Sequence, residues 1–312
     1  MSHLFDRLGY VTLFALCAFT LLSLVTAWNW VSDLTSHFRV QYLVLLLLIS
    51  ILFLSRKRPV PAVMSLLFAG INLFPLLPFL FGAAPAMAGN PAHRVLMVNL
   101  HHYENDQYGK VRQLIRTQEP EVILFLEVTE KWTEMLRGEL GGYPYSKVAP
   151  REDAMGIGLF SRLELKDLEI GPIGETNIPS VLGRMKVGSK WVRVIGTHLM
   201  SPLTPRFTED RNRQLGALQE VLNGEKGLKM VLGDFNLTPW SSLMKNFGRS
   251  TGLMDTRIGQ GIKPTWPSMF PPLWIPIEHC MVSPEIGIHK FQIGPEVGSD
   301  HLPVILDFSI AS

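Results

Sequence analysis

The sequence predicts an α/β domain of sheets packed face to face with helices outside them, preceded by an α-helical membrane region. Two observations support this. Apolar residues are concentrated before residue 90, where only seven charged side chains occur. After residue 90, many short apolar runs are separated by a few amphipathic segments, which is typical of strands and helices around one core. We therefore divide the 312-residue chain into a membrane region, 1–89, and a domain, 90–312.

Three apolar segments of the first region are long enough, or nearly so, to cross a bilayer as helices. They are Leu8–Trp28, Val40–Ser55 and Val60–Phe81. One such segment is compatible with a buried helix of a soluble protein, but three in succession with almost no charge favour membrane spans. In the third segment, Pro75 and Pro78 should kink the helix, and Asn72 needs a hydrogen-bonding partner.

The loop between the second and third segments sets the predicted orientation. Arg56, Lys57 and Arg58 form a basic cluster, which the positive-inside rule places in the cytoplasm. With three spans, the protein is then a multi-pass protein of the inner membrane whose domain faces the periplasm. The small residues of Ala83–Gly89 are similar to a signal-peptidase site, but a simple linker is the favoured interpretation.

The domain is nearly neutral. Five basic and two acidic residues precede residue 90, which leaves the domain 24 of the 29 basic and 25 of the 27 acidic residues. It lacks the positive field that attracts nucleic acids, so DNA or RNA is a less favoured substrate. Cys17 and Cys280 lie in different regions, so the domain can form no internal disulfide.

Apolar runs after residue 90 predict strands at Arg94–Leu100, Glu121–Glu127, Met155–Phe160, Val181–Val187, Trp191–Leu199, Lys229–Phe235, Ile277–Val282 and Leu302–Ile310. Amphipathic segments predict helices at Lys110–Thr117, Glu130–Leu136, Glu209–Leu222 and near Ser241–Phe247. Gly141–Tyr145 is expected to be a turn.

Polar side chains recur at or just beyond the carboxyl ends of the predicted strands. They are Asn99, Glu127, His198, Asp234, Asn236 and the pair Asp300 and His301. Each alone has an ordinary explanation, such as a turn residue or a hydrogen-bonded structural histidine. Together, they are the groups needed for metal-assisted attack of water on a phosphodiester. A divalent cation neutralises the phosphoryl oxygens, a carboxylate holds the water, and an imidazole handles a proton or charge.

These motifs resemble the endonuclease/exonuclease/phosphatase superfamily, which includes DNase I, exonuclease-III-type repair nucleases, inositol polyphosphate 5-phosphatases and neutral sphingomyelinases. The matching pieces are Asn99, Glu127, Thr197-His198, Gly233-Asp234-Phe235-Asn236, Pro276-Ile277-Glu278-His279 and Ser299-Asp300-His301. The resemblance extends from about residue 94 to 310 and implies a DNase I-like four-layer α/β/β/α sandwich, here in a membrane-anchored member of bacterial type. It also implies cleavage of phosphate esters with Mg²⁺ or Mn²⁺.

The resemblance makes Glu127 the principal metal ligand, with Asn99 and Asp300 completing or supporting the site. Glu278 departs from the family pattern, which usually has Asp there to orient the catalytic histidine or to touch the metal region. Glutamate keeps the charge but adds a methylene, so its carboxylate would retreat from the site or crowd it. A plain acid at a strand end is the alternative for Glu278.

The resemblance also assigns the groups that act on the phosphate. Asp234 would orient or deprotonate the attacking water, and Asn236 would help to fix the phosphate. His198 and His301 would contact the scissile phosphate, with Asp300 holding the His301 ring in the required tautomer. Whether Asp234 or His301 is the base stays open.

Two further segments suggest substrate contacts. Arg206 and Arg211 could bind a second phosphate or an anionic head group, or they could lie on the solvated first turn of a helix. Residues Thr265–Pro276 contain four prolines, which exclude a regular strand. Trp266 and Trp274 in this loop suit contact with lipid, or packing under the loop as core.

The leading functional hypothesis is a membrane-anchored, metal-dependent phosphodiesterase or phosphatase that acts outside the cytoplasmic membrane, with a phospholipid head group as the preferred substrate. An extracytoplasmic nuclease is the first alternative, and it predicts a basic groove. A non-catalytic binding module that keeps the fold is the second, and it predicts loss of the metal ligands, which this sequence retains.

Overall fold

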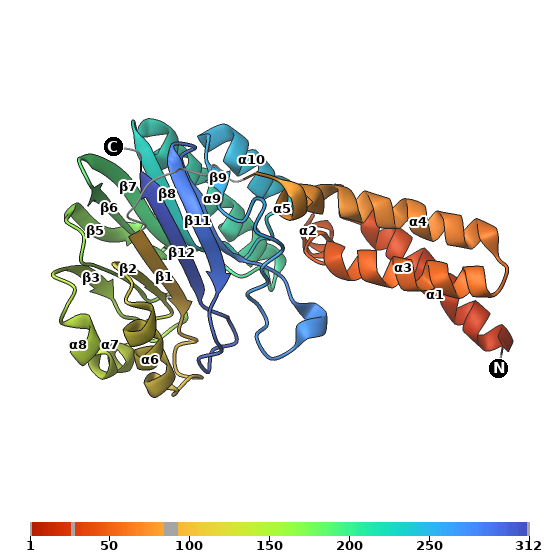
Figure 1. Cartoon of the computed structure of the whole chain (residues 1–312), viewed down its shortest axis with the longest axis horizontal. Coiled ribbons are helices and arrows are strands. Elements are labelled where there is room, and N and C mark those ends of the chain that lie inside the picture. Colours follow the sequence, from red (N-terminus) through yellow and green to blue (C-terminus); the bar gives the residue numbers. More distant parts are fainter. Residues whose placement is uncertain (1, 26–28, 84–92, 311–312) are drawn as a thin grey trace.

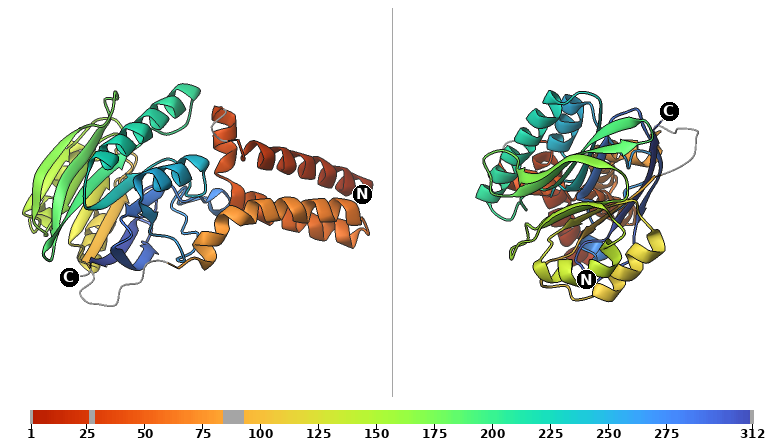
Figure 2. Two further views of the ribbon diagram at one scale, coloured as in Figure 1. Left: turned by 90° about the horizontal axis from the view of Figure 1, so that it is seen from above. Right: turned by 90° about the vertical axis from the view of Figure 1, so that its left-hand side faces the viewer.

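The computed structural model of the chain describes residues 2–25, 29–83 and 93–310, which form two parts (Figure 1). A helical arm is formed by the residues before 84, and an α/β domain by those from 93 onward. The arm projects from one side of the domain (Figures 1 and 2). Most of the predicted linker or cleavage site at Ala83–Gly89, and the predicted domain boundary, lie outside the described residues.

The arm consists of α1 (Ser2–Leu22), α2 (Trp30–Ser36), α3 (Arg39–Ser55), α4 (Pro59–Leu73), the 3-10 turn η1 (Phe74–Leu76) and α5 (Leu77–Phe81). Leu46 and Phe53 are fully buried in the core of the arm. The Asn72 amide donates to Oγ1 of Thr20 at 2.9 Å, which supplies the partner that its apolar surroundings demand. At Pro75 the α-helix gives way to η1, because proline provides no backbone donor.

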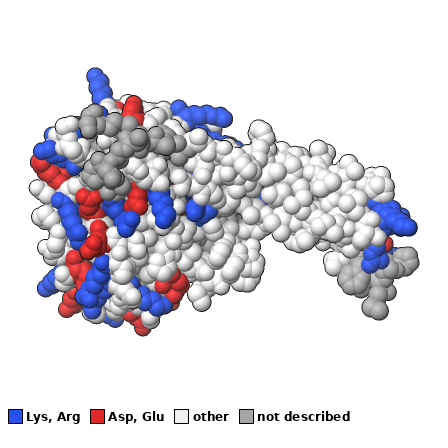
Figure 3. All heavy atoms as spheres, viewed as in Figure 1, with Lys and Arg blue, Asp and Glu red and all other residues white. Residues whose placement is uncertain are grey.

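Two parts of the arm are long and apolar enough to cross a membrane. Pro59–Phe81 is 23 residues long and has a mean hydropathy of 2.0 over an 18-residue stretch, and α2 with α3, bent by 67°, form a second candidate. In the view of Figure 3, charged residues lie on the domain and at the far end of the arm, with an uncharged stretch between them. At that far end the exposed Arg56, Lys57 and Arg58 join α3 to α4. Three membrane spans stay a prediction.

The domain contains two six-stranded mixed sheets. The first has the order β11 (Ile286–Ile293), β12 (Val304–Ile310), β1 (His93–Asn99), β2 (Val122–Leu126), β4 (Ile157–Ser161) and β3 (Tyr145–Ala149). The second has the order β5 (Leu165–Pro172), β6 (Pro179–Val187), β7 (Lys190–His198), β8 (Leu228–Asp234), β10 (Glu278–Val282) and β9 (Met254–Asp255). In each sheet one central pair is parallel, β1 with β2 and β7 with β8.

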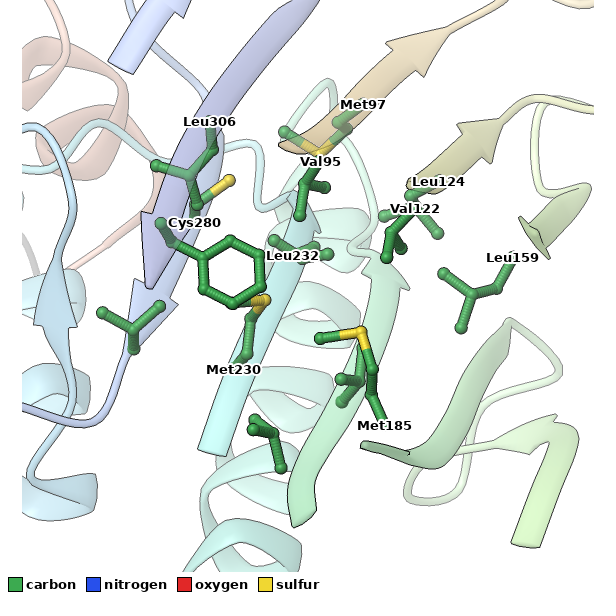
Figure 4. Packing of buried hydrophobic residues seen from close by; sticks show 14 of the residues in the cluster. Val95, Met97, Val122, Leu124, Leu159, Met185, Met230, Leu232, Cys280 and Leu306 are labelled. Atoms are coloured by element: carbon green, nitrogen blue, oxygen red, sulfur yellow. The ribbon is translucent and has the colours of Figure 1, made fainter. Parts of the chain in front are cut away.

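The core lies between the two sheets. Val95 and Met97 of β1 point into it, whereas Leu96 and Val98 point to the opposite face. This alternation follows from the two-residue period of a strand. Figure 4 shows residues of the two sheets meeting in this layer, among them Val95, Met97, Val122 and Leu124 from the first sheet and Met230, Leu232 and Cys280 from the second.

Helices cover the outer faces of both sheets and complete four layers (Figure 2). They are α6 (Tyr108–Gln118), α7 (Glu130–Met135) and α8 (Arg137–Leu140) over the first sheet, and α9 (Pro205–Gly224) and α10 (Ser242–Thr251) over the second. The hydroxyl oxygens of Thr129, Thr204 and Ser241 accept backbone N–H groups and cap the amino ends of α7, α9 and α10. The predicted α/β fold with two packed sheets is confirmed.

The strands that the sequence predicted are all present, with ends shifted by a few residues. The strands that it missed, β3, β5, β9 and β11, are the edge strands of the two sheets. In β5, Lys166, Asp167 and Glu169 are exposed, so the strand lacks the apolar run that marks an interior strand. The turn predicted at Gly141–Tyr145 ends where β3 begins, at Tyr145.

The arm contacts the domain through α2 and α5. Trp30 donates its indole N–H to the carbonyl of Pro202 at 2.7 Å, and Trp240 donates its own to the carbonyl of Ser36 at 3.0 Å. The Trp240 ring also packs edge-on against Phe79 of α5. These contacts fix the end of the arm against the loops that follow β7 and β8.

A buried ion pair crosses the same interface. Nη2 of Arg211 lies 2.9 Å from Oδ2 of Asp33, and the two side chains are 0% and 2% exposed. Removing one partner of such a pair leaves the other charge buried and uncompensated. Arg211 therefore belongs to the interface between arm and domain.

We expect Asp33→Asn to lower the free energy of unfolding of the full chain by about 3–5 kcal/mol, because the Arg211 guanidinium stays buried without its counter-charge. Asp167→Asn is the control, since its pair with Arg184 is exposed and 3.8 Å long, and surface pairs contribute at most about 1 kcal/mol. The melting temperatures of both variants, measured by thermal unfolding in detergent, test this expectation. Equal losses of melting temperature would contradict a special role for the buried pair.

Candidate active site

Four strand ends place polar side chains at one edge of the sandwich. Asn99 ends β1, Glu127 follows β2, His198 ends β7 and Asp234 ends β8. Because β1 runs parallel to β2, and β7 to β8, each pair of strands brings its two side chains to the same level. All four residues are more than nine-tenths buried.

The backbone at this edge is unusual. Glu127 and Asn236 have φ angles of 58° and 50°, in the left-handed region that non-glycine residues seldom adopt. At Gly233, with φ 155°, an added Cβ would lie 1.8 Å from the carbonyl oxygen of Thr197 on the neighbouring strand. Only glycine fits there. Backbone strain of this kind is concentrated at functional sites.

Glu127 is held by its neighbour on β1. The Asn99 amide donates to Oε1 of Glu127 at 3.0 Å, while Oδ1 of Asn99 accepts the backbone N–H of His101 at 3.0 Å. The two bonds fix both ends of the Asn99 amide. They therefore fix the direction in which the Glu127 carboxylate points.

A second group of charged side chains lies on the other sheet. Glu278 begins β10 and is the register partner of Asp234 on β8. Oε1 of Glu278 accepts a hydrogen bond from Nδ1 of His301, which also lies 3.8 Å from Oδ2 of Asp234. Glu278 is 1% exposed, so it is not a plain acid at a strand end. The resemblance implies that Asp300 holds the ring of His301, but Oδ1 of Asp300 lies 3.8 Å from Nε2 of His301, beyond hydrogen-bonding distance.

These contacts separate the pKa values of the buried groups. Burial disfavours the charged form of His301, but Glu278, Asp234 and Asp300 outweigh it and raise the pKa of His301 to about 10. Burial would raise the pKa of Glu278, yet the charge and hydrogen bond of His301 lower it. Burial and the charge of Glu278 raise the pKa of Asp234 well above its usual value. Burial lowers the pKa of His198. At neutral pH, His301 is therefore protonated and His198 is neutral.

Asp300 lies at the rim of this cluster. Its Oδ2 accepts the indole N–H of Trp266 at 3.0 Å, and its Oδ1 lies 3.4 Å from Nδ1 of His101. The side chain is 37% exposed, in contrast to Asp234 and Glu278. Asp300 thus connects the loop that carries Trp266 with the loop that follows β1.

A cavity of about 410 Å³ joins these elements. Its polar lining includes Glu127, His198, Asp234, Asn236, Asp300 and His301. Its apolar lining includes Leu34, Phe38, Leu203, Trp266, Ile275 and Ile277. Leu34 and Phe38 come from the arm, so arm and domain form the cavity together.

Three of the predicted contact residues lie apart from this cavity. Arg206 is exposed on the first turn of α9. Arg211 is turned away from the cavity into its ion pair with Asp33. Trp274 is not among the lining residues, and its carbonyl accepts the amide of Gln41 on α3 at 2.9 Å. Trp266, in contrast, lines the cavity, and its contact with a substrate stays a prediction.

Several lining residues were not predicted from the sequence, among them two groups of polar or aromatic side chains. His101 and His102 follow Asn99 after one intervening residue, Leu100, so their position just beyond a strand was a usable signal. His37 and Phe38 belong to the arm, and no pattern in the sequence connects them with a cavity of the domain.

Two sets of donors fit a divalent cation. Asp234, Glu278 and His301 each bring one ligand atom within 4.8 Å of the others, and all three are buried. Their oxygen and nitrogen donors suit Mg²⁺ or Mn²⁺, although Glu278 and His301 already bind each other. In the set that the resemblance implies, Glu127, Asn99 and Asp300, the carboxylates of Glu127 and Asp300 line the cavity, and Asn99 holds Glu127.

Buried carboxylates, an amide and imidazoles at one edge of a two-sheet sandwich define a class of proteins, the metal-dependent phosphoester hydrolases. Within this class, the model of the Endonuclease/Exonuclease/phosphatase family matches residues 98–301. The chain belongs to this family.

Solved structures show the same fold. Humanized D. rerio TDP2 with 14 mutations is 15% identical, with a TM-score of 0.61 over 70% of this chain and 99% of that one. The human Nocturnin catalytic domain with bound sulfate is 19% identical, with a TM-score of 0.56 over 71% and 94%. The family member from Bacteroides vulgatus is 18% identical, with a TM-score of 0.59 over 71% and 100%. The comparison with curated proteins gave no match.

Glu278→Gln should shift the pKa of His301 from about 10 down toward its ordinary value of 6.5, because the variant removes a charge that stabilises the imidazolium. NMR titration of ¹⁵N-labelled histidine rings, with EDTA present to exclude metal, measures the shift. Glu296→Gln changes an equivalent charge in an exposed pair with Lys110 and should leave His301 unaffected. If His301 titrates identically in both variants, Glu278 does not control its protonation.

Proposed function

We propose that the protein is a membrane-anchored, divalent-metal-dependent phosphodiesterase or phosphatase that hydrolyses phosphate esters of lipid head groups outside the cytoplasmic membrane. The cavity that the arm and the domain form together is the observation that supports a lipid substrate. Its lining includes the polar residues Glu127, Asp234 and His301 and, from the arm, the apolar residues Leu34 and Phe38. A phosphate ester attached to an apolar group matches both kinds of lining, whereas a wholly polar substrate would leave the apolar residues uncovered.

Glu127, supported by Asn99 and Asp300, would hold the Mg²⁺ or Mn²⁺ ion. A bound divalent cation neutralises charge on the phosphate and so favours attack by water. The hydrogen bond from the Asn99 amide supports this assignment, because it orients the Glu127 carboxylate toward its task. The group that orients Glu127 is thus an amide, and the histidines of the site stay available for the phosphate. Asp300 supports it from the rim, where its carboxylate is partly exposed.

Asp234 would hold the attacking water and accept its proton. Its raised pKa supports this role, because a stronger base accepts the proton more readily. His301 carries a proton at neutral pH, so it would stabilise the negative charge of the phosphate instead of acting as the base. His198 and Asn236 line the same cavity and would donate hydrogen bonds to the phosphate oxygens.

The surface of the arm supports a location in the membrane. Phe14, Ile51 and Leu67 are 77%, 64% and 60% exposed, and side chains of this kind are stable in contact with lipid. The basic loop at the far end of the arm would lie in the cytoplasm by the positive-inside rule. The catalytic domain, 90–312, would then face the periplasm, and the membrane region, 1–89, would cross the inner membrane three times.

A nuclease is the second candidate. One solved structure with this fold is D. rerio TDP2 in complex with a single-strand DNA product, at 14% identity and a TM-score of 0.61 over 70% of this chain and 100% of that one. The balance of 24 basic and 25 acidic residues after residue 90 favours the lipid substrate over DNA, because it provides no excess of positive charge.

The test is hydrolysis by the full chain in mixed micelles, with Mg²⁺ or Mn²⁺ and with EDTA. The substrates are a phospholipid panel, bis-p-nitrophenyl phosphate and plasmid DNA. We expect metal-dependent cleavage of a phospholipid that falls at least ~100-fold in Asp234→Ala and in His301→Ala, because each removes a group that acts on the proton or the charge.

Glu164→Gln is the matched control for this assay, since Glu164 forms an exposed pair with Lys186 and should be dispensable. Cleavage of DNA alone would place the nuclease first. If none of the substrates were cleaved with either metal, the result would count against an enzyme and for a binding module.

A further inference from the structure

A second cavity lies at the base of the arm, where α4 meets the domain. Its volume is about 620 Å³, and it shares no lining residue with the catalytic cavity. Most of its lining is apolar. It includes Leu24, which follows α1, Leu66, Leu67 and Ile71 of α4, and Phe74 of η1. Two cations, Arg39 and Lys245, complete it. The cavity is therefore an apolar groove with positive charge at its border.

Arg39 is the first residue of α3 and is 5% exposed. Its Nη2 donates to the carbonyl of Ser23 at 2.8 Å. Its Nε and Nη1 are buried and have no hydrogen-bond partner among the described residues. Buried donors on a charged group cost much free energy unless an acceptor is present, so these two nitrogens call for an acceptor from outside the described chain.

Lys245 on α10 adds a second positive charge at the same cavity. Partial burial, together with the charges of Arg39 and Arg249, lowers the pKa of Lys245. Within 2–25, 29–83 and 93–310, no carboxylate forms an ion pair with any of these three residues. Like charges that are gathered without an acid attract an anion.

The apolar part of the groove continues from these cations along α4. Phe74 lies at the domain end of the groove and Leu66 more than two helical turns further along the arm. Phe74 and Leu67 are 74% and 60% exposed, so the groove is open on its outer side. With the arm in a membrane, Arg39 at the start of α3 lies at the level of the lipid head groups, and the groove faces the acyl chains. Basic pockets between membrane helices bind the head groups of anionic lipids in this way.

We propose that this cavity binds one anionic phospholipid, with its phosphate on Arg39 and Lys245 and an acyl chain along α4. The proposal rests on the location of the arm in the membrane and is independent of the catalytic assignment. A free phosphate ion would satisfy the same cations. The apolar lining selects the lipid, because an ion would leave that lining exposed.

Native mass spectrometry of the full chain in detergent tests the proposal, with phosphatidylglycerol and phosphatidylcholine of identical acyl chains offered in equal amounts. We expect bound phosphatidylglycerol to predominate. Lys245→Gln should weaken its binding by about tenfold, because one charge-assisted hydrogen bond to phosphate is lost. Lys290→Gln removes an exposed cation of β11, far along the chain from this cavity, and should leave binding unchanged.

Equal binding of the two lipids, or equal binding of phosphatidylglycerol by Lys245→Gln and Lys290→Gln, would overturn the proposal. Displacement of the lipid by millimolar inorganic phosphate would overturn the assignment to a lipid. Arg39→Gln should also weaken the binding of phosphatidylglycerol. If Arg39→Gln does not fold, Lys245→Gln alone provides the test. Hydrolysis of bis-p-nitrophenyl phosphate should be the same in Lys245→Gln as in the unchanged chain, so the catalytic proposal is tested separately.

Discussion

The close packing of the two sheets is the constraint on which the site depends. Gly196 of β7 lies so near the first sheet that an added Cβ would be 2.6 Å from a methyl carbon of Leu124 on β2. This contact fixes the height of one central strand pair against the other, since interiors are packed as densely as organic crystals. Glu127 follows β2 and His198 ends β7, so the same contact brings both side chains to one cavity. A shift of either sheet along its strands would separate these lining residues.

The second requirement is compensation of buried charge. Glu278 and Asp234 lie opposite each other on neighbouring strands, and two carboxylates buried together repel one another unless a cation is present. His301 provides the positive charge through its hydrogen bond to Glu278. A similar arrangement lies behind the site, where Arg257 pairs with Asp255 at 2.7 Å. The Glu278 carboxylate reaches His301 directly, so this glutamate does not retreat from the site.

Most of the interior of the fold could be predicted from the sequence, and the edges could not. Interior strands such as β1 and β8 are apolar on both faces, and this pattern is visible in the residues alone. Edge strands such as β5 are half exposed and carry charges that mask the pattern. Strand-end residues such as Glu127 and Asp234 could be predicted, because each apolar run is short and a polar residue ends it. The partner of Arg211 could not be found, because Asp33 lies in another region of the chain and only the docked arm brings it close.

The arm takes part in both cavities, because three successive residues at its bend lie on their walls. His37 and Phe38 line the catalytic cavity, and Arg39 lines the groove at the base of the arm. Nδ1 of His37 accepts the backbone N–H of Thr238 at 3.3 Å, two residues beyond Asn236 of the site. A change in the bend between α2 and α3 would therefore move a wall of the catalytic cavity. A domain separated from the arm would lack that wall and would expose Arg211, so the arm is part of the site that it positions.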